Sequence, residues 1–338
     1  MMPAKNGTDL SKCFWQSNKC KKQEKRESKL KIISNTTNFQ LEQGTAVAIG
    51  KFDGVHIGHR RLLEEILKRK EEGLLACVFT FDPPPEVLFG ISDGKTLSSL
   101  EEKRSLFEKM GVDVLVEFPM TRETAGMAPE AFVTEVLLGR LNMQFIAAGT
   151  DLSFGSRGAG NVALLEQMAA QNDFEIKIID KVFLNGAEVS SSYIRALVKE
   201  GKMEAVQECM GIPFFFKGEV VHGNHIGTGI GFPTVNLVPA KDKLLPPNGV
   251  YYSRTLVDGI EYTSITNIGR KPTVGDQEKM GVETYLYGFN QDIYGKEIEV
   301  YLLSFRRPEQ KFDSLEQLKE QLRLDVEAGK IRENCGNC

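Results

Sequence analysis

The 338-residue chain lacks several features that mark particular classes of protein. Its 42 basic and 46 acidic side chains leave a net charge of −4, so it has no global positive field of the kind that attracts nucleic acid. No apolar run approaches the roughly 20 residues that cross a membrane as a helix. The polar N-terminus also lacks the apolar core of a signal peptide. We therefore expect a cytoplasmic protein with neither a nucleic-acid nor a membrane partner.

The sequence is also poor in cysteine, with six scattered along its length. Cys77 and Cys209 lie in apolar segments, which predicts ordinary core positions. The other four, near the two ends of the chain, supply in principle the thiolates of a zinc site. We favour instead two ends with free thiols, because terminal segments are commonly poorly ordered. These four are Cys13, Cys20, Cys335 and Cys338.

What the chain does have is a change of pattern near residue 211. Residues 1–30 are a polar, lysine-rich leader without periodicity. Residues 31–211 alternate β-leaning apolar runs with helical spacing, which predicts a parallel sheet with helices on both faces. Residues 212–331 contain short β-rich runs, turn signals and a last helix, which predict a small closed antiparallel β-barrel with a C-terminal helix on it. Residues 332–338 are expected to be a tail.

Both domains are expected to contain several strands, and the first is expected to contain more helices than the second. In the first domain, strands are expected near residues 31–33, 45–49, 74–81, 112–117, 145–148 and 174–180, and helices near 101–110, 131–140, 162–171, 193–200 and 203–210, besides one beginning at the end of the stretch 50–59. In the second domain, strands are expected near 215–222, 234–237, 250–257, 260–268, 282–286 and 297–303, and a helix near 313–328.

The most informative stretch is residues 50–59, GKFDGVHIGH. It joins a predicted buried strand to a predicted helix, whose free N–H groups and positive dipole end favour anions. Gly50 and Gly54 allow the backbone to approach a bulky ligand. His56 and His59 lie on one face of the first helical turn. Their N–H groups can stabilise negative charge that develops on a phosphoryl oxygen.

Two later stretches of the first domain also suit an anionic ligand. Residues 149–161, GTDLSFGSRGAGN, form a glycine-rich loop at the carboxyl end of a predicted strand, where parallel sheets bind ligands. Ser191 and Ser192 can cap the helix that follows them. Arg195 lies in the first turn of that helix, where the dipole disfavours a cation. Arg195 therefore indicates an anionic partner, such as a triphosphate.

The second domain has a constellation of its own. Residues 218–236 contain GEVVHG and GTGIGFPTVN, whose glycines can form a flap that closes over a nucleotide. Thr234 and Asn236 alternate along one predicted strand, so their side chains point to the same face.

Taken together, these segments resemble the bacterial bifunctional riboflavin kinase/FAD synthetase family, over roughly residues 31–330. The first stretch resembles the HxGH signature of nucleotidyltransferases. The second-domain segments resemble the riboflavin kinase signature GxVxHG followed by GFPTAN. The resemblance implies a Rossmann-like nucleotidyltransferase domain followed by a riboflavin kinase barrel. It also implies two reactions: riboflavin and ATP give FMN and ADP in the barrel, and FMN and ATP give FAD and pyrophosphate in the N-terminal domain.

In the first domain, the resemblance implies ATP-binding, catalytic and flavin-binding residues. Arg195 is expected to hold the β- and γ-phosphates, and Phe154 to line the flavin or the adenine. The residues expected to bind ATP are Gly50, Phe52, Asp53, Gly54, Asp151, Ser191 and Ser192. The residues expected to be catalytic are His56, His59 and Arg195.

In the second domain, the resemblance implies a magnesium-dependent kinase site. Glu283, in the segment VET, is expected to be the general base that takes the proton of the ribityl 5′-hydroxyl. Asn267, in NIGRKPT, and Arg306, in RRPEQKF, are expected to contact the flavin. The hydroxyl of Thr234 and the amide oxygen of Asn236 are hard ligands that suit Mg²⁺. The residues expected to bind ATP are Gly223, Gly231, Thr234 and Asn236.

Four positions depart from the family pattern. Pro84 and Thr228 replace a usual histidine and a usual arginine, Leu152 replaces a usual phenylalanine, and Arg157 lies one position away from the usual arginine. These departures leave two alternatives open: a chain with only one live activity, and a flavin-binding regulatory protein without turnover. All the expected catalytic residues are present, which favours the bifunctional enzyme. The sequence leaves the oligomeric state and any channelling of FMN open.

Overall fold

The computed structural model describes residues 29–223, 231–271 and 279–335. By its contacts the chain divides into two compact units, Met1–Ser191 and Ser192–Cys338. The helix α9 (Met203–Met210) lies before the boundary expected at residue 211, yet it packs on two strands of the second unit, β9 (Phe214–Glu219) and β14 (Glu297–Arg307). The domain boundary after residue 211 stays a prediction.

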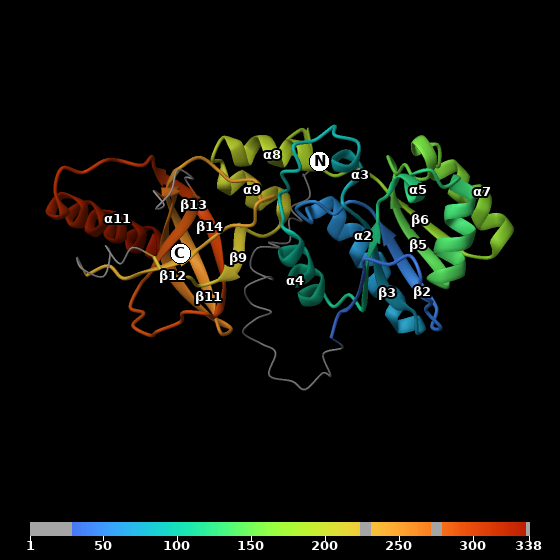
Figure 1. The fold of residues 1–338 in the computed structure, drawn as a ribbon, viewed down its shortest axis with the longest axis horizontal. Helices are drawn as coiled ribbons and strands as arrows, with labels where there is room; N and C mark the ends of the chain where they lie inside the picture. The colour runs from blue at the N-terminus through green and yellow to red at the C-terminus, as the bar shows by residue number, and fades with distance from the viewer. Residues whose placement is uncertain (1–28, 224–230, 272–278, 336–338) are drawn as a thin grey trace, which may run out of the picture. The chain divides into compact units, whose positions relative to one another are not determined.

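The first unit is built on a six-stranded sheet in the order β1-β4-β3-β2-β5-β6 (Figure 1). Every neighbouring pair of strands in it is parallel, as the sequence predicted. The strands are β1 (Lys31–Ser34), β2 (Thr45–Ile49), β3 (Leu75–Asp82), β4 (Val114–Pro119), β5 (Met143–Gly149) and β6 (Glu175–Ile179). A separate hairpin consists of β7 (Phe183–Leu184) and β8 (Ala187–Glu188).

Helical segments connect these strands. They are α2 (Ile57–Lys68), η1 (Arg69–Glu72), α3 (Pro85–Leu88), α4 (Leu100–Met110), α5 (Arg122–Ala125), α6 (Pro129–Ala131), η2 (Phe132–Arg140), η3 (Ser156–Gly158) and α7 (Val162–Asn172). The helix expected over residues 131–140 is for most of its length a π-helix, η2. Such wide turns are rare in proteins and usually occur in short pieces.

The strand order reverses between β2 and β5. The chain moves outward from β2 to β3 and β4, and then returns to place β5 on the other side of β2. In doubly wound sheets, ligands bind beyond the carboxyl ends of the strands at such a reversal. The loops that follow β2 and β5 are residues 50–56 and 150–161, which the sequence had already singled out.

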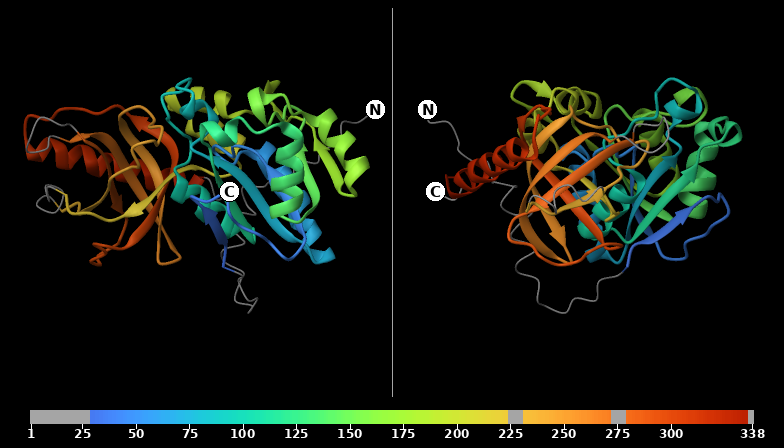
Figure 2. Two further views of the ribbon diagram at one scale, coloured as in Figure 1. Left: turned by 45° about the vertical axis from the view of Figure 1, so that its right-hand side comes forward. Right: turned by 60° about the vertical axis from the view of Figure 1, so that its left-hand side comes forward.

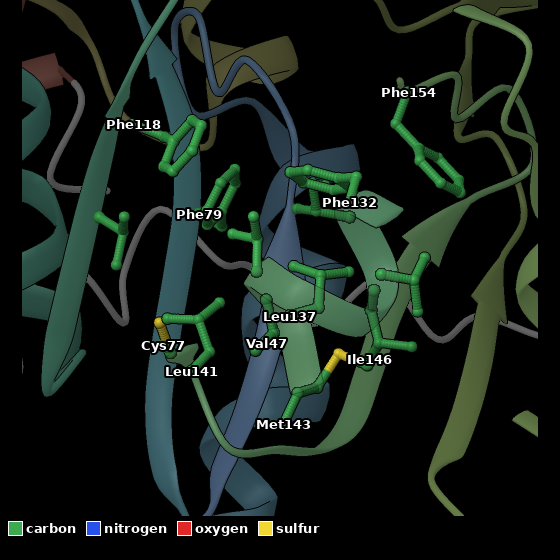
Figure 3. Close-up of a cluster of buried hydrophobic side chains, with 14 of the residues drawn as sticks. Val47, Cys77, Phe79, Phe118, Phe132, Leu137, Leu141, Met143, Ile146 and Phe154 are labelled. Atoms are coloured by element: carbon green, nitrogen blue, oxygen red, sulfur yellow. The ribbon is translucent and has the colours of Figure 1, made fainter. Parts of the chain in front are cut away.

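The core of the first unit lies on one face of this sheet. Alternate residues of the central strands, such as Val47 of β2 and Phe79 of β3, meet Phe132 of η2 and Leu165 of α7 there (Figure 3). The helix α2 packs against β2, β3 and β5 through buried leucine and isoleucine side chains that are not part of this cluster. Helical segments therefore cover both faces of the sheet, as expected.

The second unit is a six-stranded antiparallel sheet in the order β10-β13-β12-β11-β14-β9 (Figures 1 and 2). Val221, two residues after the edge strand β9, forms one isolated bridge with Asn236 of the other edge strand, β10, and its N–H donates to the carbonyl of Asn236 at 2.9 Å. In the described residues, the expected closed barrel is thus joined by one bridge rather than by a full ladder. Its remaining elements are α8 (Ser191–Lys199), β10 (Thr234–Leu237), β11 (Gly249–Val257), β12 (Ile260–Lys271), β13 (Lys279–Leu286) and α11 (Leu315–Cys335).

One buried layer of this sheet is polar. The hydroxyls of Thr255, Ser264, Ser253, Thr266 and Thr284 form a continuous chain, with oxygen–oxygen distances of 2.8 to 2.9 Å. All five side chains are buried. Because each hydroxyl can both donate and accept, the chain satisfies polar groups that would be costly to bury alone.

The last helix, α11, packs on the other face of the same sheet (Figure 2). Its Val326 contacts Val250, Tyr252 and Ile265. A Cβ at Gly329 would lie 2.7 Å from the hydroxyl of Tyr287, so the glycine lets the helix approach closely. The helix extends beyond the predicted end at residue 328.

Among the helices that the structure describes, none has the length and apolar character needed to span a membrane.

We expect Phe79→Ala to lower the free energy of unfolding of the first unit by about 3–5 kcal/mol, because it would leave a cavity among packed rings. Phe79 is completely buried and lies 5.3 Å from Phe118 and 5.5 Å from Phe132, between ring centroids. Denaturant titration would measure the change. The matched control is Phe183→Ala, whose ring is 64% exposed and whose loss should cost about 0.5 kcal/mol or less. Equal effects of the two variants would contradict this packing.

Candidate active sites

The turn from β2 into α2 has a strained backbone. Phe52 and Val55 have φ angles of 51° and 41°, in the left-handed region, and both side chains are completely buried. This conformation is costly for a bulky residue and most costly for a β-branched one. Between them, Gly54 has a φ of 81°, which glycine adopts without strain. Strain of this kind persists only where the surroundings enforce it, and it is common at functional sites.

Asp53 is the residue that enforces the turn. Its carboxylate accepts the backbone N–H of Leu97 at 2.7 Å and that of Ser98 at 3.4 Å. Its carbonyl oxygen accepts the hydroxyl of Ser191 at 3.0 Å. Asp53 and Ser191, both expected to bind ATP, therefore tie three segments of the first unit together. Their contact with ATP stays a prediction.

The two histidines of the motif are stacked at the N-terminus of α2. Their ring centroids are 3.7 Å apart and the ring planes differ by 22°. His56 is the N-cap residue, and its Nδ1 accepts the backbone N–H of His59 at 3.4 Å. The buried Nδ1 of His59 has no hydrogen-bond partner among the residues that the structure describes. The structure therefore brings both imidazoles to the position where a helix favours an anion.

Both histidines are uncharged near neutral pH. Burial lowers the pKa of His56 to about 4, although the carboxylate of Asp151 acts in the opposite direction. Burial, and then the neighbouring His56, lower the pKa of His59 well below its ordinary value. In a neutral imidazole whose Nδ1 accepts a hydrogen bond, the proton is on Nε2. His56 therefore keeps an N–H donor on the side of the ring away from the helix cap.

Asp151, in the loop after β5, lies near this pair. Its carboxylate raises the pKa of His56, so the loop after β5 contributes a negative charge to the surroundings of the histidines. Asp151 is exposed and forms an ion pair with Lys181 at 3.5 Å. Lys181 in turn contacts Glu188 of β8 at 2.8 Å. The structure thus leaves Asp151 accessible, as binding of a ribose hydroxyl requires.

Two aromatic residues of the predicted site are part of the interior. Phe154 is 4% exposed, and its ring lies 5.7 Å from that of Phe132 in the core (Figure 3). The ring of Phe52 packs edge-on against Phe107, with centroids 5.6 Å apart, and lies 5.0 Å from that of His59. Both side chains pack in the interior of the first unit. Direct contacts of Phe154 with flavin and of Phe52 with ATP stay predictions.

Two other expected residues of the first site lie beyond the division between the units. Ser192 is exposed and Arg195 is half-buried, both in the first turns of α8. Their expected roles, binding of ATP and of its β- and γ-phosphates, stay predictions.

The second unit aligns three predicted residues across three strands. Asn236 of β10 lies opposite Glu283 of β13, which lies opposite Asn267 of β12. Directly opposite residues share a face of the sheet, so the three side chains form one row. Asn236 is buried, and the other two are half-buried. A Cβ at Gly223 would overlap the amide of Asn236, which explains why this position is a glycine.

Two residues of β10, Thr234 and Asn236, have side chains that suit a magnesium ion. Thr234, two positions before Asn236 on β10, shares its face. The hydroxyl of Thr234 and the amide oxygen of Asn236 are hard oxygen donors of the kind that Mg²⁺ prefers. The described residues contain no group of three His, Cys, Asp or Glu side chains able to hold a metal.

Two residues near this row were not singled out from the sequence. Glu309 accepts a hydrogen bond from Asn267 Nδ2 at 3.4 Å and another from Asn248 at 3.4 Å. Asp325 of α11 accepts hydrogen bonds from Arg306 and Arg307. The sequence offered a signal only for Glu309, which lies in the RRPEQKF segment. Asp325 lies on the last helix, where nothing in the sequence marked it.

Some predicted positions lie outside the described residues or side chains. Thr228 is among them, so the departure at this position is not described. Gly231 is described, with an exposed position and a φ of 84°.

Cys77 and Cys209 are free and buried, as expected. The side chains expected to be free thiols or zinc ligands lie outside the description: Cys13, Cys20, Cys335 and Cys338.

Both units match known protein families. A family model described as FAD synthetase matches residues 38–193, and one described as riboflavin kinase matches residues 210–331. A bifunctional riboflavin kinase/FMN adenylyltransferase from Listeria monocytogenes is 35% identical, over 86% of this chain and 93% of its own length. The chain belongs to this family. Another member, from Bacillus subtilis, is 34% identical over 84% of this chain and 91% of its own.

A solved structure is similar to this riboflavin kinase/FMN adenylyltransferase family member over most of its length. It is a Streptococcus pneumoniae protein described as a macrolide-efflux protein. The similarity has a TM-score of 0.78 and 29% sequence identity, and it covers 89% of this chain and 99% of the other. The described role belongs to that protein, and the similarity supports the two-unit fold.

The stacked histidines predict a pH-dependent stability. In the unfolded chain, their pKa values return to near 6.5, so the unfolded state binds more protons than the folded state below that pH. Their contribution to stability is therefore complete above pH 6.5 and is lost as the pH falls toward the value of about 4 for His56. We expect the unfolding midpoint to fall less steeply between pH 7 and pH 5 in a His56→Gln/His59→Asn variant than in the wild type.

Thermal unfolding at several pH values would measure these slopes. Phe183→Ala is the control, because it removes a 64% exposed side chain of the same unit that carries no titratable group, so the slope of the wild type should be unchanged. Identical slopes for the double variant and the wild type would show that the histidines are not held neutral.

Proposed function

We propose that this chain is a bifunctional enzyme of flavin-cofactor synthesis, which phosphorylates riboflavin to FMN and adenylylates FMN to FAD. One observation carries the proposal: each unit has its own polar cluster, the stacked histidines in the first and the row Asn236–Glu283–Asn267 in the second. Riboflavin, FMN and ATP are its substrates. A cytoplasmic location and a requirement for Mg²⁺ are part of the proposal.

FAD formation takes place at the N-terminus of α2. A phosphate oxygen of FMN attacks the α-phosphorus of ATP, and pyrophosphate leaves. Negative charge grows on the oxygens of the transferred group, and N–H donors held in place by the protein stabilise that charge. His56 and His59 serve as neutral donors, since their low pKa values keep them uncharged at physiological pH. The free backbone N–H groups of the helix add to this stabilisation.

FMN formation takes place along the row of the second unit. Glu283 accepts the proton of the ribityl 5′-hydroxyl as that oxygen attacks the γ-phosphorus of ATP, and ADP leaves. Thr234 and Asn236 would hold Mg²⁺, and the bound ion would supply positive charge that offsets the negative charge of the nucleotide phosphates. Asn267 lies next to Glu283 on the neighbouring strand, so it can orient the flavin beside the base.

We expect His59→Ala to lower the rate of FAD formation about 100-fold or more, because it removes a donor that acts on the transition state. Riboflavin phosphorylation should stay within about twofold of the wild type, since that reaction uses the other unit. Separate assays with FMN and with riboflavin as substrate would measure the two rates. An equal loss of both activities would contradict the assignment of this motif to one reaction.

Glu283→Gln should have the opposite pattern. Loss of the general base is expected to lower kcat for riboflavin phosphorylation by a factor of about 10² to 10⁴, while conversion of FMN to FAD continues. The amide keeps the size of the carboxylate, so the fold of β13 should not change. Full kinase turnover in this variant would rule out Glu283 as the base.

A time course with riboflavin, ATP and Mg²⁺, followed by chromatography of the flavins, tests the whole proposal. FMN that rises first and is followed by FAD supports both activities. A single product would favour the alternative with one live activity, and Pro84 or Thr228 would be the position to restore. Riboflavin that stays bound and unchanged, without consumption of ATP, would favour the regulatory alternative.

A further inference from the structure

The end of β14 contains a β-bulge at Arg306. Arg307 pairs with Val250 of β11, whereas the next pair is Phe305 with Tyr251, so Arg306 is an extra residue without a partner. Bulges redirect side chains and are common beside active sites. In a regular strand, consecutive side chains point to opposite faces. Here the bulge lets both Arg306 and Arg307 reach the same carboxylate.

That carboxylate is Asp325 of α11, which is completely buried. It accepts a hydrogen bond from Arg307 Nε at 2.8 Å, and Nη2 of the same guanidinium lies 2.7 Å away. Gln321, one turn earlier on α11, donates to it at 3.1 Å. A carboxylate removed from water needs such partners, and the fork of Arg307 supplies the strongest of them.

The contact of Arg306 with Asp325 is different. Only Nε reaches the carboxylate, at 3.3 Å, and the side chain is 36% exposed, against 13% for Arg307. Its guanidinium lies 5.9 Å from the centre of the Tyr252 ring. The terminal nitrogens of Arg306 donate no hydrogen bond to any residue in the described ranges. Two arginines facing one carboxylate also leave a surplus positive charge, and Arg306 is the more exposed of the two.

The cluster lies at the end of the row that carries the kinase site. Val250, the partner of Arg307, is also the partner of Asn267, which lies opposite Glu283. One cross-strand line therefore runs from Glu283 through Asn267 and Val250 to Arg307, with Arg306 bulged beside it. A side chain held at this end of the line can reach a ligand that lies along it.

We propose that Asp325 is a positioning residue for the flavin substrate, and that it acts through Arg306. Asp325 holds Arg307 as a fixed anchor between β14 and α11. It orients Arg306 by Nε alone, so that both terminal nitrogens are left to donate to oxygen atoms of the flavin. This inference rests on the proposed kinase activity and assigns a role to α11, a helix with no expected site residue.

The test is the kinetics of riboflavin phosphorylation by full-length Asp325→Asn at saturating ATP. We expect KM for riboflavin to rise about tenfold while kcat stays within about twofold, because ground-state positioning is lost and the base is untouched. Arg306→Ala should raise KM by a similar factor. Asp325→Asn combined with Arg306→Ala should raise it no further, since the two residues act through one contact.

Arg323→Ala is the control on the same helix. Among the described residues, Arg323 forms ion pairs with Glu320 and Glu327 on the exposed face of α11, so its loss should leave KM unchanged. Circular dichroism and thermal unfolding of each variant check that the second unit is still folded. If Asp325→Asn does not fold, Arg306→Lys replaces it: lysine keeps the charge but has no Nε–H at this position, and it should give the same rise in KM.

The outcomes separate this inference from the proposed function. A lower kcat with unchanged KM, or an effect of Asp325→Asn that persists in full in the Arg306→Ala background, would show a purely structural role and overturn the inference. An unchanged KM in both Asp325→Asn and Arg306→Lys would overturn it as well. A wild-type chain that does not phosphorylate riboflavin would instead overturn the proposed function, and the inference with it.

Discussion

The buried carboxylate of Asp53 is the interaction on which the first unit's site depends. It binds backbone N–H groups of Leu97 and Ser98, and the carbonyl of the same residue receives the hydroxyl of Ser191. These contacts hold a turn whose neighbouring residues have left-handed backbones. Without them, the strained turn would relax and the first turn of α2 would lose its two stacked histidines. The arrangement of the two histidines, to which we assign the phosphoryl chemistry in our proposal, is thus maintained by contacts of Asp53 within the protein.

Strand register has the same role in the second unit. The antiparallel pairing of β10, β13 and β12 places Asn236, Glu283 and Asn267 opposite one another, although they come from distant parts of the sequence. A shift of one residue would turn Glu283 to the other face, where the hydroxyl chain is buried. That chain and the contact of α11 at Asp325 hold the sheet from its two faces. The site therefore depends on both layers that enclose the sheet.

The sequence predicted most elements of the fold, because apolar spacing and glycine or proline signals are local. It placed β2, the motif and α2 correctly, and it found the six strands of the second unit. It did not predict that Phe154 would be a core residue, because a phenylalanine in a glycine-rich loop reads equally well as a ligand contact. It also did not predict that Asp53 would bind backbone groups of a loop more than forty positions later, since nothing near Asp53 indicates that loop.

The order of the residues alone shows which side chains are available: two histidines at a helix N-terminus, a glutamate on a strand, and a threonine and an asparagine two positions apart. It also indicated the family, since these short motifs depend only on neighbouring residues. Which of these side chains come together depends on how the chain folds in three dimensions. The fold brings the negative charge of Asp151 to the surroundings of His56, and it joins Asp325 to a bulged arginine through helix docking. The physical reason is that burial, pKa shifts and long-range pairing arise from contacts between distant segments, which no local pattern encodes.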